Sequence, residues 1–327
     1  MKSVIIGAGA IGGYAGAAMA RAGQDVTLFG RGPHLRAMQE NGVRVQTAKD
    51  EWHEHPKVSG SLHEMGDEIG IVDVIYLAVK AHSLPEVAPH LRPLMGPDTV
   101  VVSMQNGVPW WFFDVPGVPH TGLRLESVDP GGVIARSIEF RRVVGSIVYI
   151  AAEIVEPGVI RHIESTRVSI GEPDGSRSER VRAIAESLAA AGLKAPVTTH
   201  LRAEIWVKLL GNIAFNPISA LTGGTLAGIA RFPETRQLVR AIMQEASEIA
   251  VKAGLDLPVT IEQRIDGAAK IGEHKTSMLQ DLEKGRPLEL EPMTGAVLEI
   301  GDTLGVPMPC TRAVYACAKL LAEVRHT

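Results

Sequence analysis

The sequence predicts an α/β protein in which a doubly wound, mostly parallel sheet comes first and an all-α domain follows. Three observations support this prediction. Short apolar runs alternate with helical patterns over the first hundred residues, consecutive strand patterns follow between 143 and 171, and strand patterns end after His200. Alternation of strands and helices is typical of parallel strands joined by crossover helices. The chain has 327 residues, which fits two domains, and we place them at 1–199 and 200–327.

The elements of the first domain follow from this alternation. Apolar, β-branched runs predict strands at 3–6, 25–29, 43–47, 72–79 and 99–103, and helical patterns predict helices at 10–22, 33–41 and 82–91. Strand patterns then occur at 145–154, 159–163 and 167–170, with Glu156-Pro157-Gly158 as a hairpin turn between the first two. We expect these three strands to extend the sheet in antiparallel fashion. A helix at 178–191 and a short strand at 195–199 complete the domain.

Helical patterns fill the second domain. They predict helices at 200–216, 218–228, 232–254, 258–270, 275–284, 288–304 and 309–326. Pro217 is expected to stop or bend the first of these helices, because proline lacks the backbone N–H that the helix needs.

Composition excludes several classes of protein. A net charge of −4 gives no electrostatic reason to expect nucleic acid or an anionic membrane as partner. No apolar run approaches the about 18 residues of a membrane-spanning helix. Cys310 and Cys317 do not form a C-x-x-C pair, and the histidine spacing is not that of a metal site. We therefore expect reduced thiols, no metal and a cytoplasmic protein.

The first 22 residues hold the most specific local motif. The strand Val4–Ile6 is followed by Gly7-Ala8-Gly9-Ala10-Ile11-Gly12, which reads G-x-G-x-x-G, and then by a helix of small residues. In a Rossmann-type fold the first glycine permits a tight turn, the second lets a pyrophosphate approach the backbone, and the third lets helix and strand pack closely. The N–H groups of the first helical turn then face the phosphates. A secretory signal peptide is the alternative interpretation, but glycines interrupt the apolar run and a second strand pattern follows.

The end of the second strand favours NADP(H) as the cofactor. A site specific for NAD usually has a carboxylate there, whereas this chain reads Phe29-Gly30-Arg31. Arg31 can pair with a 2′-phosphate, although it could also be a solvated loop residue. Lys80 and Asn106 follow two later strands, and ligands bind at the carboxyl ends of such strands. We count both among the cofactor-binding candidates and Asn106 also among the substrate-binding ones.

Four consecutive aromatic residues, Trp110 to Phe113, follow the Gln105-Asn106-Gly107 turn. One interpretation is the start of a helix that buries its aromatic side chains. The others are a wall or lid of the substrate pocket, which would suit a bulkier substrate, and a contact between subunits.

A polar stripe lies on an otherwise apolar helix after residue 200. Lys208, Asn212 and Asn216 are spaced by four residues and so share one helical face, and most of their neighbours are apolar. Buried lysine and asparagine need partners, which indicates a site rather than a solvated face. A carbonyl that accepts hydride needs an acid beside its oxygen, and Lys208 could supply both the charge and the proton.

Together these motifs resemble the ketopantoate reductase family along essentially the whole chain. The resemblance is carried by G-A-G-A-I-G, V-K-A-H around Lys80, Q-N-G around Asn106, W-x-K-L-x-x-N-x-x-x-N-P around Lys208, and S-M-L-Q-D followed by L-E-L. It implies that Lys208 is the proton donor and that Glu289 engages the substrate hydroxyl and supports the acid. It also implies that Asn212, Asn216 and Ser277 bind substrate, and that Lys80 and Asn106 lie between nicotinamide and substrate.

The chain departs from the family pattern in two places. Members often read T-E-I-D-Y-x-N-G where this chain reads L-E-L-E-P-M-T-G, so Glu291, Pro292 and Thr294 replace more usual residues. His274 also stands where an asparagine is common. These departures leave the identity of the 2-oxo acid open, but not the class of reaction.

We therefore predict an NADPH-dependent reductase of a 2-oxo acid, ketopantoate (2-dehydropantoate) or a bulkier relative, with a homodimer as the candidate assembly. The alternatives are a β-hydroxyacid- or imine-type dehydrogenase and a non-catalytic NADP(H) sensor. A sensor would have no reason to keep the set Lys208, Asn212, Ser277 and Glu289. The physiological substrate, the oligomeric state and the direction of flux stay open.

Overall fold

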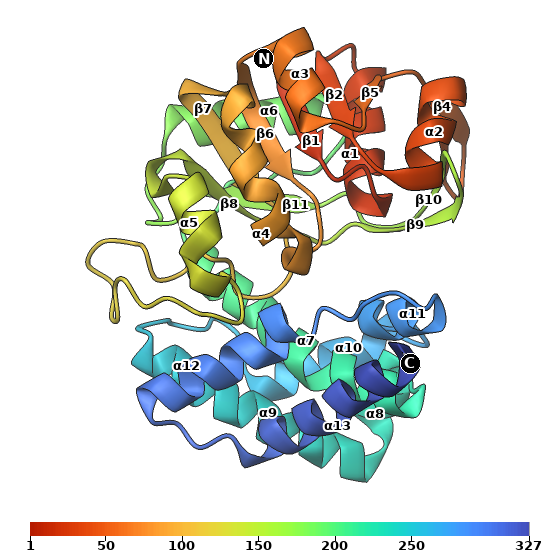
Figure 1. Cartoon of the computed structure of the whole chain (residues 1–327). Coiled ribbons are helices and arrows are strands. Elements are labelled where there is room, and N and C mark those ends of the chain that lie inside the picture. The colour runs from red at the N-terminus through yellow and green to blue at the C-terminus, as the bar shows by residue number, and fades with distance from the viewer. Residues whose placement is uncertain (327) are drawn as a thin grey trace. The chain divides into compact units, whose positions relative to one another are not determined.

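The computed structural model describes residues 1–326 of the chain, and it divides into two compact units (Figure 1). The first unit contains Met1–Gln105 and Gly132–Leu201, and the second contains Asn106–Gly131 and Arg202–Thr327. The expected division near residue 200 therefore needs one correction, because residues 106–131 belong to the helical unit. Their side chains pack on helices that come much later in the sequence.

The first unit is built on a seven-stranded sheet in the order β11-β8-β7-β6-β1-β2-β5. All neighbouring strands are parallel except β11, which pairs antiparallel with β8 at one edge. The strands are β1 (Ser3–Ile6), β2 (Val26–Phe29), β5 (Lys57–Ser59), β6 (Val72–Leu77), β7 (Met95–Ser103), β8 (Val143–Val148) and β11 (Val168–Gly171). The parallel sheet predicted for this part of the chain is confirmed.

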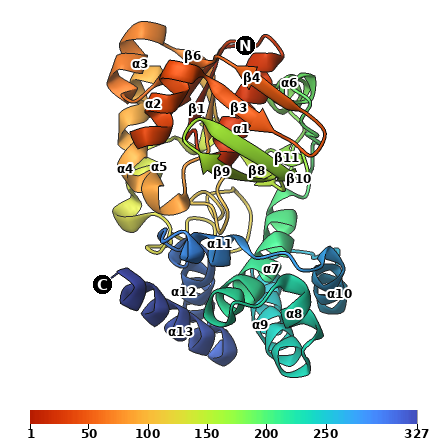
Figure 2. The ribbon, with the colours of Figure 1, turned by 90° about the vertical axis from the view of Figure 1, so that its right-hand side faces the viewer.

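A second, four-stranded sheet has the order β4-β3-β10-β9 (Figure 2). It consists of β3 (Val43–Gln46), β4 (Glu51–Glu54), β9 (Ala151–Glu156) and β10 (Val159–Glu164). The predicted hairpin at Glu156-Pro157-Gly158 is present, but it does not extend the main sheet as expected. Instead β10 pairs with β3.

The structure corrects three further strand predictions. The sequence predicted neither β4 nor β5, because both are short and alternate polar with apolar residues. The single strand predicted at 145–154 is two strands in different sheets. At 195–199 there is no strand but an isolated bridge between Val197 and Ile170.

Helix α1 (Ala10–Arg21) packs on both sheets, and its glycines explain how it can. A Cβ on Gly16 would collide with Leu28 of the main sheet, and one on Gly13 would lie 2.5 Å from Ile160 of the second sheet. Small residues on two faces of one helix thus let two sheets approach it closely. A continuous core forms around α1, with Ile5, Leu28, Val45 and Ile160 each at most 1% exposed.

The remaining helices of the first unit are short and connect its strands. They are α2 (Gly32–Asn41), α3 (Leu62–Ile69), α4 (Leu84–Val87), α5 (Val133–Ser137) and α6 (Glu179–Ala190), with 3₁₀ turns η1 (Ala81–Ser83), η2 (Ala88–Leu94) and η4 (Phe140–Arg142). A further 3₁₀ turn, η3 (Pro130–Gly132), spans the point where the chain re-enters this unit. The helix predicted at 82–91 is therefore broken into η1, α4 and η2, and two prolines, Pro85 and Pro89, lie within it.

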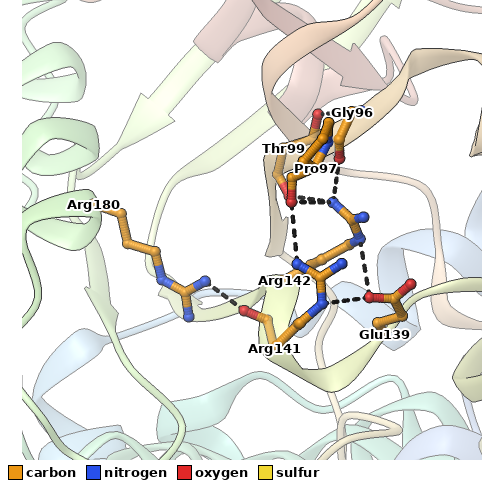
Figure 3. Close-up of polar contacts among 7 residues, drawn as sticks. All are labelled: Gly96, Pro97, Thr99, Glu139, Arg141, Arg142 and Arg180. Atoms are coloured by element: carbon orange, nitrogen blue, oxygen red, sulfur yellow. Dashed lines mark hydrogen bonds and ion pairs between the residues drawn. The ribbon is translucent and has the colours of Figure 1, made fainter.

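A network of arginines ties the start of β7 to the chain that enters β8 (Figure 3). The buried Arg142 donates to the backbone carbonyls of Gly96, Pro97 and Thr99, at 2.5, 3.2 and 3.3 Å. Glu139 forms ion pairs with both Arg141 and Arg142. Because these carbonyls lie near the amino end of β7, the network stabilises the end of the sheet opposite to the carboxyl ends of the strands, where ligands bind in such folds.

The second unit is helical. Its helices are α7 (Leu201–Thr222), α8 (Leu226–Arg231), α9 (Pro233–Lys252), α10 (Ile261–Ile271), α11 (Ser277–Glu283), α12 (Ala296–Leu304) and α13 (Pro309–His326). A single π-helical turn, η5 (Glu291–Gly295), precedes α12. The expectation that Pro217 stops or bends the helix is wrong as to stopping, because α7 runs on to Thr222. The side chains of Ile218 and Ala220 in this last stretch are buried, so the helix continues to pack on the core beyond the proline.

The segment 106–131 is anchored on this helical unit. Trp111, Phe112 and Phe113 are at most 1% exposed, and the Phe112 ring lies 5.6 Å from that of Trp206 in α7. The guanidinium of Arg202 covers the Phe112 ring at 4.6 Å and donates to the Phe112 carbonyl. Glu299 of α12 accepts from the backbone N–H groups of Glu126 and Ser127. These three aromatic residues are therefore core residues. They lie in consecutive turns and not at the start of a helix, which was one of the three interpretations.

None of the helices in the described residues is long and apolar enough to span a membrane.

Candidate active site

The predicted site residues fall into two groups, one in each unit. The glycine loop, Arg31 and Lys80 belong to the first unit. Asn106, Lys208, Asn212, Asn216, Ser277 and Glu289 all belong to the second, although Asn106 precedes the others by about a hundred residues.

The glycine loop joins β1 to α1 as the motif predicts. Gly7 has a φ of +107°, and a Cβ there would lie 2.6 Å from the Val79 backbone nitrogen. A Cβ on Gly12 would lie 2.8 Å from the Cβ of Ala78 and closer still to the Gly7 carbonyl oxygen. Both positions therefore require glycine. Gly7 needs it for its backbone conformation and for space, and Gly12 needs it for space alone.

Gly9 has the opposite environment, because its Cβ would meet no atom within 4 Å. It stands just before α1, and no side chain caps that helix end. The N–H groups of the first turn, which includes Ala10 and Ile11, are the ones that a bound pyrophosphate would contact. The loop fits the phosphates of a dinucleotide, with crowded glycines where the chain packs on itself and an open one where a ligand would approach.

Arg31 lies at the carboxyl end of β2, as predicted, and its side chain is 59% exposed. Its guanidinium pairs with Glu86 of α4 at 3.2 Å. It also lines a cavity of about 630 Å³ together with Phe29, Ser61, His63, His90 and Arg92. The cationic head is therefore accessible to an anion, although Glu86 already holds it in place.

His34, which closely follows Arg31 in the sequence, lies in α2. Its Nδ1 accepts from the backbone N–H of Gly158 at 2.9 Å, which places the ring proton on Nε2. Burial lowers the pKa of this histidine, and the nearby Ala8 backbone partly opposes that effect. His34 thus holds the β9–β10 turn against α2.

Lys80 follows β6 and is half-buried, directly after the strand end on which the glycine loop packs. The same strand end is held by Gln105, which follows β7 and whose side-chain amide donates to the carbonyls of Leu77 and Val79. The structure therefore places Lys80 beside the predicted cofactor loop in the first unit.

In the second unit Lys208 and Asn106 are in direct contact. The Lys208 ammonium donates to Asn106 Oδ1 at 2.7 Å. Burial lowers the pKa of Lys208 to about 8, and the carboxylate of the buried Glu289 acts in the opposite direction. A lysine with a pKa near neutral pH is well matched to proton transfer. Three residues from three separate stretches of the sequence thus form one acid with its partners.

The polar stripe of α7 is confirmed as one continuous helical face. Asn212 is half-buried and Asn216 is 6% exposed, with its amide 3.9 Å from the sulfur of Met293. Ser277 is the exposed first residue of α11. Thr276, not Ser277, caps that helix by accepting from the Leu279 N–H, so the Ser277 hydroxyl does not have this structural task. No cluster of potential metal ligands exists within residues 1–326.

Comparison with known proteins assigns the family. The model of "Ketopantoate reductase PanE/ApbA" matches residues 3–109, and that of its C-terminal part matches residues 200–322. A 2-dehydropantoate 2-reductase of Mesorhizobium japonicum is 49% identical over 326 residues, 99% of each chain.

Two solved structures are similar over their whole length. A protein from Ralstonia solanacearum, named as a candidate ketopantoate reductase, has a TM-score of 0.93 at 39% identity and covers 99% of this chain and 98% of its own. A PanE/ApbA family ketopantoate reductase from Ralstonia eutropha has a TM-score of 0.85 at 26% identity, with both chains fully covered. This chain therefore belongs to the ketopantoate reductase PanE/ApbA family.

Proposed function

We propose that this enzyme reduces 2-dehydropantoate to pantoate with NADPH. The observation that carries the proposal is Lys208, held by Asn106 and close to Glu289 in a half-buried site. The full-length likeness to a 2-dehydropantoate 2-reductase at 49% identity supports the same reaction.

The chemistry follows from the residues of the helical unit. A bound nicotinamide supplies hydride to the carbonyl carbon of the 2-oxo acid, and the oxygen then needs a proton. Lys208 gives that proton from its ammonium group, and its positive charge stabilises the developing alkoxide. Glu289 favours the protonated form of Lys208, so that the acid is available near neutral pH. Asn212, Asn216 and Ser277 would hold the carboxylate and hydroxyl of the substrate without adding negative charge.

The cofactor preference rests on the first unit. The glycine loop would hold the pyrophosphate, and Arg31 would pair with the 2′-phosphate of NADPH. Arg31 is accessible at a strand end that carries no carboxylate of its own. This supports NADPH over NADH, and Lys80 would lie beside the nicotinamide end.

The interpretation of Trp110 to Phe113 as a pocket wall loses its support. Three of these four side chains are core residues, so they give no reason to prefer a bulkier substrate over ketopantoate. We further propose a cytoplasmic enzyme, in line with two cysteines that form no disulfide, and a homodimer as its assembly.

The test is a steady-state assay of NADPH oxidation with ketopantoate and a panel of bulkier 2-oxo acids. Ketopantoate should give the highest kcat/KM, and NADH should give a lower one than NADPH. A bulkier acid that is preferred tenfold or more would contradict the proposed substrate. Lys208→Ala should lower kcat by about 10²–10⁴-fold while NADPH still binds. A variant with near-normal kcat would contradict the proposed acid.

A further inference from the structure

The π-helical turn η5 begins two residues after Glu289 and coincides with the stretch where the chain departs from the common family sequence. Such turns are rare and occur frequently at functional sites. Its hydrogen bonds show what the wide turn achieves. The Ala296 N–H, which in an α-helix would donate to the Pro292 carbonyl, donates instead to the carbonyls of Glu291 and Met293.

The Pro292 carbonyl is used by a distant part of the chain. It accepts from the backbone N–H of Val108 at 2.9 Å. The preceding residue, Gly107, has a φ of +95°, and a Cβ there would lie 2.8 Å from the Pro292 carbonyl carbon and nearer still to its oxygen. The backbone at 107–108 is therefore docked on η5 so closely that no side chain fits between them.

This contact lies one residue from Asn106, which holds the Lys208 ammonium at 2.7 Å. We infer that Gly107, docked on the Pro292 carbonyl of the π-helical turn, is a positioning residue that sets the Asn106 amide against Lys208. The inference rests on the proposed function only in its kinetic part.

Geometry indicates how sensitive this arrangement is. To accommodate a Cβ, Gly107 would have to move by roughly 1 Å to reach an ordinary van der Waals separation. If Asn106 moved with it, its distance to Lys208 would grow from 2.7 Å beyond hydrogen-bond length. Displacements of about 1 Å at catalytic groups can lower a rate by about 10²-fold.

The same turn also contacts other parts of the site and is braced from outside. Met293 contributes the sulfur near Asn216. On the other side, Glu291 accepts from the Tyr315 hydroxyl at 2.7 Å and pairs with Lys319 at 3.0 Å. This brace from α13 offers a way to perturb η5 without altering residue 107.

The experiment is a double-mutant cycle of Gly107→Ala and Asn106→Ala, with Gly117→Ala as control. Gly117 lies in the same segment with a φ of +79°, but its Cβ would meet no atom within 4 Å, so the control carries the same kind of backbone strain without the contact. With ketopantoate, Gly107→Ala should lower kcat by about 10²-fold. The double variant should be no slower than Asn106→Ala alone, and Gly117→Ala should stay within about twofold of wild type. Effects of Gly107→Ala and Asn106→Ala that simply multiply would overturn the inference.

A second readout does not depend on the substrate. The pKa of Lys208 can be followed by NMR of its ε-methylene group, assigned by the signal missing in Lys208→Met. Loss of the amide acceptor should lower this pKa in Asn106→Ala and in Gly107→Ala alike, because the hydrogen bond favours the charged form. A lower pKa in Asn106→Ala but not in Gly107→Ala would overturn the inference. An enzyme inactive on ketopantoate would contradict the proposed substrate and still leave this titration decisive.

If Gly107→Ala does not fold, Tyr315→Phe takes its place. It removes the hydroxyl that Glu291 accepts from and should give a smaller loss of kcat, about three- to tenfold, that is again absent on the Asn106→Ala background. An unchanged kcat and an unchanged Lys208 pKa in Tyr315→Phe would then count against the turn as the positioning element.

Discussion

Lys208 should lower the stability of the folded protein at neutral pH, and replacing it with methionine should make that visible. Burial lowers its pKa from 10.5 to about 8, so the folded protein binds this proton less well than the unfolded chain does. At about 1.4 kcal/mol per pKa unit, the cost is about 3 kcal/mol at pH 7. The cost is fully present below about pH 8 and fades as the pH rises towards 10.5, where both states become neutral.

Methionine has a similar length and no charge, so Lys208→Met removes this pH dependence. It also leaves Asn106 Oδ1 without its donor, which costs about 1–3 kcal/mol. The net change at pH 7 is therefore small, but the difference in unfolding free energy between variant and wild type should shift by about 2 kcal/mol between pH 7 and 9.5.

The assay is urea denaturation followed by circular dichroism at several pH values, with kcat measured on the same samples. Wild type should gain stability relative to Lys208→Met as the pH rises, while the variant has lost most of its kcat. Parallel stability curves across this range would refute the burial argument and, with it, the reason why Lys208 is an acid at neutral pH.

Four other substitutions test the site and the core. Arg31→Ala should raise the Kd for NADPH by about tenfold or more and leave the Kd for NADH nearly unchanged. Glu86→Gln should lower the Kd for NADPH, because it removes the carboxylate that competes for Arg31. Titration calorimetry measures these dissociation constants, and equal losses of affinity for the two cofactors in Arg31→Ala would argue against the 2′-phosphate contact. Glu289→Gln should lower the pKa of Lys208 further and move the alkaline limb of the pH–rate profile to lower pH, because the Glu289 carboxylate raises that pKa. An alkaline limb at the wild-type pH would show that Glu289 does not act on the lysine. Trp111→Ala should cost about 3–5 kcal/mol in denaturant unfolding, since the side chain is 0% exposed, and a changed substrate ranking at full stability would restore the pocket-wall interpretation.

The sequence by itself determined the parts of this protein whose physics is local. G-x-G-x-x-G after a β-branched run requires a tight turn, an open backbone and a close helix contact, and Gly7, Gly9 and Gly12 show these three environments. The spacing of Lys208, Asn212 and Asn216 was enough to place them on one helical face, because helical periodicity depends only on neighbours along the chain. The same holds for most strands of the parallel sheet.

Only the tertiary structure decided what depends on distant residues. Nothing local assigns the β9–β10 hairpin to a second sheet, since its partner β3 lies about a hundred residues away. Nor does any local pattern predict that the Asn106 amide contacts the Lys208 ammonium, because the segment that carries Asn106 is placed by buried aromatic side chains and by helices near the other end of the chain. The π-helical turn was likewise not predicted. Its wide hydrogen bonding is stabilised by a contact with Val108, and such a contact exists only once the chain has folded.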